Sequence, residues 1–185
     1  LLSFVAGLVN ITGLLALKTL TTNVTGHFAY FAEEMMKHEY SAAITFLVFT
    51  LFFLFGSFLS SFLEELISIR NPQLSHLFPI TLEMFILIAI GFFGTNLGLG
   101  SFGGKLTAFF LLFAMGIQNS LVTNISKSIV RTTHLTGLFT DLGIELSQLF
   151  FYRKPEEVKK LKTSIYLRLS IITFFFIGCF SGGII

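Results

Sequence analysis

Two short stretches rich in threonine and glycine contain the residues best suited to bind a polar molecule. TTNVTGHF occupies 21–28 and TTHLTGLF occupies 132–139. Thr25 and Thr136 are suited to cap the helices that follow, because their hydroxyls can accept hydrogen bonds from the free amides of a first helical turn. A helix start also presents the positive end of its dipole. At membrane depth, two such starts predict a site for an anionic or polar solute. The simpler interpretation is that they only cap interfacial helices and pack them tightly.

Two asparagines precede these stretches at equivalent places. Asn10 and Asn119 each lie within an apolar segment. An amide inside hydrocarbon must find hydrogen-bond partners, so these residues are predicted to be either solute ligands or struts between helices. Gln118, next to Asn119, has no counterpart in the first half, where Val9 stands. The candidate solute-binding residues are Asn10, Thr22, Thr25, Gly26, Gln118, Asn119, Thr133, Thr136 and Gly137.

Three acids follow the same stretches. Glu34 and Glu145 are at matching positions, and Asp141 precedes Glu145 by one helical turn. An acid at the centre of a membrane helix costs about 2.5–3.5 kcal/mol on insertion scales, so it is usually paired, protonated or functional. These acids are candidates for proton coupling, unless they lie at the membrane edge and are solvated. His27 and His134 are nearby, but no tight metal-ligand spacing is present, so neither a metal nor another cofactor is expected.

The composition places these residues in a membrane protein. Of 185 residues, 54% are hydrophobic and 12% are charged, and the mean hydropathy is +0.84. The charged fraction is about half that of an average soluble chain. The net charge of +2 is too mild for a nucleic-acid surface, and a lone cysteine, Cys179, excludes an intramolecular disulfide. No familiar catalytic motif occurs, so we expect no enzyme; the expected partners are the lipid bilayer and an unknown small solute.

Five runs with at most one charge are predicted to cross the bilayer, because a membrane-spanning helix needs about 20 apolar residues. These runs are 1–17, 41–63, 77–98, 106–126 and 169–185. The chain begins with Leu instead of Met, so we expect that residues precede it. The segments 20–38 and 135–152 are apolar on one side and acidic on another. Each is predicted to be helical, and each could cross the bilayer, re-enter it or lie in the interface.

An internal repeat organises these segments. The matched pairs are Phe4 with Phe113, Gly7 with Gly116, Asn10 with Asn119, Thr22 with Thr133, Thr25 with Thr136, Gly26 with Gly137, Glu34 with Glu145, and Gly56 with Gly178. Self-similarity of this kind is a strong fold signal. The sequence predicts an all-α polytopic membrane helix bundle of six to seven spans. A single membrane domain, 1–185, would contain three-helix units at 1–66 and 104–185, joined by a linking helix at 77–98 in a 3+1+3 order.

The basic residues bear on topology. If all seven segments cross, eight basic residues face the cytoplasm and four face outside, and the repeats are parallel. If 20–38 and 135–152 do not cross, the split is nine against three and the repeats are inverted. The rule does not choose between these arrangements. We prefer seven spans with a cytoplasmic N-terminus, because neighbouring helices can cover the acids of both segments.

Small residues are spaced for close helix packing. Gly56 with Ser60 and Gly178 with Gly182 form small-xxx-small pairs at matching places in the two units. Such pairs allow helix backbones to approach closely. We expect packing within the bundle, and the alternative is a homo-oligomer formed through these faces.

Four short motifs stand out along the chain: AGLVN at 6–10, VTGH at 24–27, AMGIQN at 114–119 and THLTG at 133–137. Together they resemble the YoaK family of small bacterial inner-membrane proteins. The resemblance implies a bacterial inner-membrane protein of about six or seven spans and supplies no established substrate. The family pattern has Asp where Asn10 stands and T-G-N where 25–27 is T-G-H. If that Asp carries a proton in the family, this chain cannot use it.

The favoured function is a small-solute transporter or permease with a site between the repeats, near the middle of the membrane. A second hypothesis is a non-transporting membrane scaffold that uses the basic stretch 153–162 to hold a partner protein or anionic lipid. A third is an intramembrane enzyme. A transporter predicts a polar central cavity, a scaffold predicts a close-packed centre, and an enzyme predicts a nucleophile or metal cluster.

Overall fold

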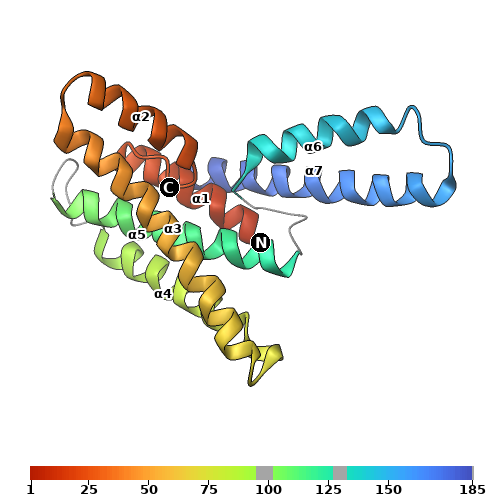
Figure 1. Cartoon of the computed structure of the whole chain (residues 1–185), viewed down its shortest axis with the longest axis horizontal. Helices are drawn as coiled ribbons and strands as arrows, with labels where there is room; N and C mark the ends of the chain where they lie inside the picture. The colour runs from red at the N-terminus through yellow and green to blue at the C-terminus, as the bar shows by residue number, and fades with distance from the viewer. Residues whose placement is uncertain (95–101, 127–132, 185) are drawn as a thin grey trace.

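The computed structural model describes residues 1–94, 102–126 and 133–184 and is built from α-helices (Figure 1). The helices are α1 (Leu2–Leu17), α2 (Val24–Met36), α3 (Tyr40–Ser68), a 3₁₀ turn η1 (Pro72–Leu74), α4 (Leu77–Phe93), α5 (Phe102–Ile125), α6 (Leu135–Gln148) and α7 (Pro155–Ile184). No strand occurs in these ranges. The expected all-α bundle with three helices, a linking helix and three helices is confirmed. The last residues of the expected linking helix, 95–98, lie outside the described residues.

Four helical segments are long and apolar enough to cross a membrane. They are α3, the segment Pro72–Phe93 that contains α4, α5 and α7. Helix α1 is apolar but shorter, with 16 residues. Bulky apolar side chains on the outer faces, such as Phe58 at 60% exposure and Phe85 at 71%, have no protein cover. Lipid is the solvent that accommodates such faces, so the protein is an integral membrane protein.

Helix α1 packs along α7, at the opposite end of the sequence, through a pair of glycines (Figure 1). A Cβ atom added to Gly7 would overlap the carbonyl of Phe175, and one added to Gly178 would overlap the carbonyl of Phe4. The two backbones therefore touch directly, as small residues permit. Near the start of α1 the hydroxyl of Ser3 donates to the carbonyl of Ile171 at 2.7 Å, and further along Ile11 lies against Gly182. The residue numbers rise together between these two contacts, so α1 and α7 run parallel.

Helices α3 and α5 repeat this contact with the equivalent residues. A Cβ atom on Gly56 would overlap the carbonyl of Phe113, and one on Gly116 would overlap the carbonyl of Phe53. The hydroxyl of Ser57 donates to the carbonyl of Gly116 at 3.0 Å. The first helix of each unit therefore packs against the third helix of the other unit. Gly56 and Gly178 lie at these two contacts, so both glycines pack within the bundle, as expected from the sequence.

Helices α1 and α5, the first helices of the two units, run antiparallel. The start of α1 lies beside the end of α5, where Gln118 Nε2 donates to the carbonyl of Leu2 at 2.8 Å. The end of α1 lies beside the start of α5, since Leu17 and Gly104 line one pocket. The repeats are therefore inverted, and the preferred parallel arrangement is wrong. The positive-inside rule could not separate the parallel from the inverted arrangement, because both arrangements put the excess of basic residues on the same side as the N-terminus.

Helices α2 and α6 are too short to cross. They have 13 and 14 residues. At 1.5 Å per residue they extend about 20 Å, against about 30 Å of hydrocarbon. The seven-span expectation is wrong for these segments, which lie on opposite sides of the bundle as half-length helices. Helix α2 packs back on α3, and α6 packs on α7 (Figure 1).

Candidate functional site

A cavity of about 660 Å³ lies where the two units meet. Its described wall is formed from the first unit by Asn10, Leu20, Thr22, Asn23, Val24, Thr25, Gly26, Ala29 and Phe53, and from the second by Asn119, Thr133, His134, Leu135, Thr136 and Phe175. Phe53 is at the centre of the charge-free run 41–63. The cavity is therefore near the middle of the apolar part of α3.

Each unit contributes the same hydrogen bond to the cavity wall. Thr22 Oγ1 donates to Asn10 Oδ1 at 2.8 Å, and Thr133 Oγ1 donates to Asn119 Oδ1 at 2.9 Å. In both cases the bond ties the segment before a half-length helix back to the first helix of the same unit. With Oδ1 engaged, the Nδ2 groups of both asparagines have no hydrogen-bond partner within the described ranges, and they are available as donors to a bound molecule.

The residues that cap α2 and α6 each lie two residues before the threonine expected from the sequence. Helix α2 begins at Val24 with Asn23 as its cap, whose Oδ1 accepts from the Gly26 amide at 3.0 Å. The expectation that Thr25 caps this helix is wrong, because Thr25 is already within the first turn. Helix α6 is likewise preceded by His134, so Thr136 is not its cap.

The glycines of the two stretches make room for these cap side chains. A Cβ atom on Gly26 would lie 2.9 Å from the Asn23 side chain, and one on Gly137 would overlap the His134 ring. His134 makes no capping hydrogen bond. The first amides of α6 therefore receive no side-chain cap, whereas one amide of α2 does. The glycine is required because the cap side chain folds over the first helical turn.

The wall is rich in hydrogen-bond donors and lacks acids. Three asparagine amide groups, threonine hydroxyls and the starts of two helices face one space, and the positive ends of both helix dipoles point toward it. Within the described residues the wall carries no carboxylate, lysine or arginine, and His134 is its one titratable side chain. Such a wall can hold a small polar or anionic molecule by hydrogen bonds, with Phe53 and Phe175 supplying apolar surface.

Two candidate residues lie away from the cavity. Gln118 is fully buried and holds α5 against the start of α1. Gly137 is not part of the described wall and instead leaves space for His134. The other seven candidate binding residues named from the sequence come together on the wall.

The acids of α6 form an ion-pair cluster with a residue of α7. Arg168 Nη1 is 2.8 Å from Asp141 Oδ2, and Arg168 Nε is 3.0 Å from Glu145 Oε2. The hydroxyl of Ser164 donates to Glu145 Oε1 at 2.6 Å. This cluster fastens α6 to α7 and is separate from the described cavity wall. Proton coupling by these acids stays a prediction.

Glu34, the equivalent acid of the first unit, has a different neighbour. It is paired with Lys37, whose Nζ lies 2.9 Å from Glu34 Oε1 and 2.7 Å from Glu33 Oε1. These groups are in the last turn of α2 and are partly exposed. Glu34 is therefore at the end of α2 that points away from the cavity.

Several wall residues escaped the sequence analysis, although the repeat could have indicated them. Asn23 and His134 are at equivalent positions in the two stretches, and both line the cavity. Phe53 and Phe175 are each three residues before a matched glycine. Arg168 gave no such signal, because the residue that matches it at the spacing of the Gly56–Gly178 pair is Phe46.

These features define a polytopic α-helical membrane protein with inverted repeats around a polar central cavity. The chain belongs to the family described as Protein of unknown function (DUF1275), which matches residues 1–185. The resemblance to YoaK is confirmed, since YoaK is a member of that family. No curated protein and no solved structure matches the chain.

Proposed function

We propose that this protein is a transporter in the bacterial inner membrane that binds a small polar or anionic solute in the cavity between its repeats. The observation that supports the proposal is the convergence of two inverted, sequence-related half-length helices on one polar cavity. Transporters with inverted repeats place their substrate sites at the repeat interface, near discontinuous helices whose N-termini point at the substrate. A scaffold would be expected to have a close-packed centre instead.

The orientation follows from the charges of the described residues. One side of the bundle carries Arg70, Arg153, Lys154, Lys159, Lys160, Lys162 and Arg168, and the other carries Lys18, Lys37 and Lys105. The basic side faces the cytoplasm by the positive-inside rule. The N-terminus, the far end of α6 and the start of α7 are then cytoplasmic, and the far end of α2 is on the opposite face.

We expect uptake to depend on both asparagines. Phosphate, acetate, glycine and urea serve as labelled probes with the purified protein in liposomes. At least one probe should enter faster than into protein-free liposomes. Asn10→Ala and Asn119→Ala should each lower that rate about 10-fold or more, because a lost hydrogen bond to a bound polar group costs about 1–3 kcal/mol.

Thr140→Val is the matched control for this experiment. The Thr140 hydroxyl donates to the Thr136 carbonyl within α6 and is exposed. Its removal should leave uptake unchanged. The proposal is wrong for this probe set if no probe exceeds the protein-free rate, and the site is wrong if both asparagine variants transport normally while remaining folded.

Water should reach the cavity from one side of the membrane. In a Cys179→Ala background, Thr136→Cys should react with a charged, membrane-impermeant maleimide at least about 10-fold faster than Phe58→Cys. Thr136 lines the cavity, whereas Phe58 faces outward from α3. The thiolate is the reactive form, and it does not form in hydrocarbon. Equal, slow labelling of both positions would show that the cavity is dry.

A further inference from the structure

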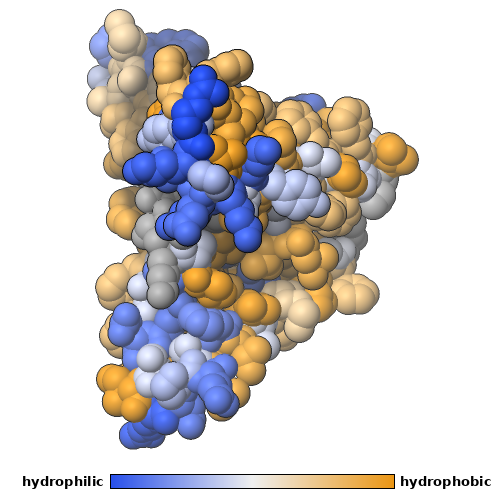
Figure 2. Space-filling view, turned by 90° about the vertical axis from the view of Figure 1, so that its right-hand side faces the viewer, coloured by the Kyte–Doolittle hydropathy of each residue, from blue (hydrophilic) through white to orange (hydrophobic). Residues whose placement is uncertain are grey.

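The first part of α7 carries cations without neutralising partners. Figure 2 looks onto the end of the molecule where the α6–α7 hairpin projects and shows hydrophilic residues gathered there. Arg153, Lys159 and Lys162 are exposed, and none has an ion pair within the described ranges. Lys154 is paired with Glu157 at 3.3 Å. The stretch 153–162 contains five cations and two acids, so this end of the helix has a net positive charge.

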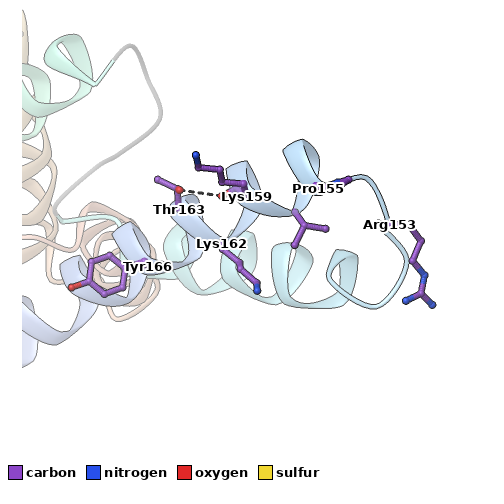
Figure 3. A pocket seen from close by; sticks show the side chains of 7 residues that line it. Arg153, Pro155, Lys159, Lys162, Thr163 and Tyr166 are labelled. Atoms are coloured by element: carbon purple, nitrogen blue, oxygen red, sulfur yellow. Dashed lines mark hydrogen bonds between the residues drawn. The ribbon is translucent and has the colours of Figure 1, made fainter.

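The cations lie along a face of α7 that α6 does not cover. A shallow pocket of about 810 Å³ is lined by Arg153, Pro155, Val158, Lys159, Lys162, Thr163 and Tyr166 (Figure 3). The other face of α7 buries Leu161 and Ile165 against α6. The pocket residues, hereafter the basic face, are therefore presented outward by a helix whose back is fixed.

The distance from the central cavity places the basic face at the level of lipid headgroups. Phe175 lines the cavity near the membrane centre. At 1.5 Å per residue along α7, Tyr166 is about 14 Å, Lys162 about 20 Å and Lys159 about 24 Å from Phe175. The hydrocarbon ends about 15 Å from the centre, and the headgroups extend to about 22 Å. Tyr166 thus lies at the hydrocarbon boundary, Lys162 lies among the headgroups, and Lys159 lies at their outer edge.

The aromatic residue of the basic face favours a lipid surface over a soluble acidic partner. Tyr166 is 75% exposed and lines the same pocket as Lys159 and Lys162. Aromatic rings next to basic residues are the composition of interfacial membrane segments, where the rings enter the boundary region and the cations meet anionic lipid. An acidic peptide would neutralise the charges and leave this ring uncovered.

We propose that the basic face of α7 binds the phosphate groups of anionic lipids in the membrane leaflet from which it emerges. Lys159 and Lys162 contact the phosphate, and the Tyr166 ring packs beside the upper acyl chains. The positive-inside assignment makes this the cytoplasmic leaflet, where anionic lipids attract basic segments. Lipid binding here requires no solute in the central cavity, so the two proposals stand or fall separately.

Lipid titration of the purified full chain tests this proposal. Bound phosphatidylglycerol and phosphatidylcholine are counted by native mass spectrometry from detergent micelles. Wild-type protein should bind phosphatidylglycerol at least about 10-fold more tightly than phosphatidylcholine. Lys159→Gln with Lys162→Gln should weaken phosphatidylglycerol binding about 30-fold and leave phosphatidylcholine binding unchanged, because each cation near the surface contributes separately. Both side chains are exposed, and thermal unfolding verifies that the variant is folded.

Lys37→Gln with Lys105→Gln is the control, because it removes the same charge from the other end of the bundle. It should change phosphatidylglycerol binding less than 2-fold. The proposal is overturned if the control weakens binding equally, or if the two lipids bind alike to wild type. It is also overturned if soluble polyglutamate competes with phosphatidylglycerol at equal affinity, which would indicate an acidic protein partner.

Discussion

Gly116→Ala should lower the midpoint of thermal unfolding by about 10 °C. A Cβ atom at Gly116 would overlap the carbonyl of Phe53, which is backbone and cannot rotate away. The helices must separate, and overpacking of this kind costs about 3 kcal/mol, which corresponds to roughly 10 °C for a chain of this size. Gly7→Ala should have a similar effect at the equivalent contact between α1 and α7. The measurement is thermal unfolding in detergent, followed by circular dichroism.

Gly91→Ala and Gly143→Ala are matched controls for this experiment. Both glycines are within helices, and a Cβ atom at either would meet nothing within 4 Å. Alanine there removes the conformational freedom of glycine and should stabilise the protein by about 0.5–1 kcal/mol. If Gly91→Ala lowered the stability as much as Gly116→Ala, the loss at Gly116 would not be caused by the backbone contact between the helices.

Arg168→Met should destabilise the protein by about 3–5 kcal/mol, because it leaves the Glu145 carboxylate unpaired in a buried position. The Glu145 side chain is 13% exposed and that of Arg168 is 11% exposed. Combining Arg168→Met with Glu145→Gln should recover much of the loss, since this double variant leaves position 145 without a charge that needs Arg168. Unfolding in increasing denaturant measures the free energies of both variants.

An exposed ion pair on the same hairpin provides the comparison. Lys154 and Glu157 are 80% and 46% exposed. Lys154→Met should change stability by less than about 1 kcal/mol, because solvent screens surface pairs. If Arg168→Met is no more destabilising than Lys154→Met, the cluster does not fasten α6 to α7, and a functional role for Asp141 and Glu145 gains support.

The composition and repeat were enough to predict the helical membrane bundle and the sets of residues that meet at its centre. Runs without charged residues indicate segments that are buried away from water. Polar residues within these runs that match between the two units indicate equivalent positions in space. Asn10 and Asn119 were identified in this way, together with the threonines that bond to them. A hydroxyl and an amide that recur at equivalent places in apolar surroundings need a partner, and here they partner each other.

The sequence could not predict in the same way which helices cross the membrane, whether the repeats are parallel or inverted, or which residues cap α2 and α6. A half-length helix such as α6 has the same apolar periodicity whether it crosses or stops. Threonine, asparagine and histidine can all precede a helix, so the choice of Asn23 over Thr25 depends on where the chain turns. From the sequence, Arg168 was interpreted only as a topology signal, because its partners on α6 are brought next to it only when the α6–α7 hairpin folds.

The exchange of helices between the two units has a consequence for how the protein is made. Helix α1 leaves the ribosome before α7, but its glycine surface around Gly7 matches α7, which is synthesised more than a hundred residues later. Neither half contains the partner of its own glycine face. The Gly7 face of α1 must stay open until translation has reached α7, and a nascent chain that stops earlier presents that open glycine face to membrane quality control.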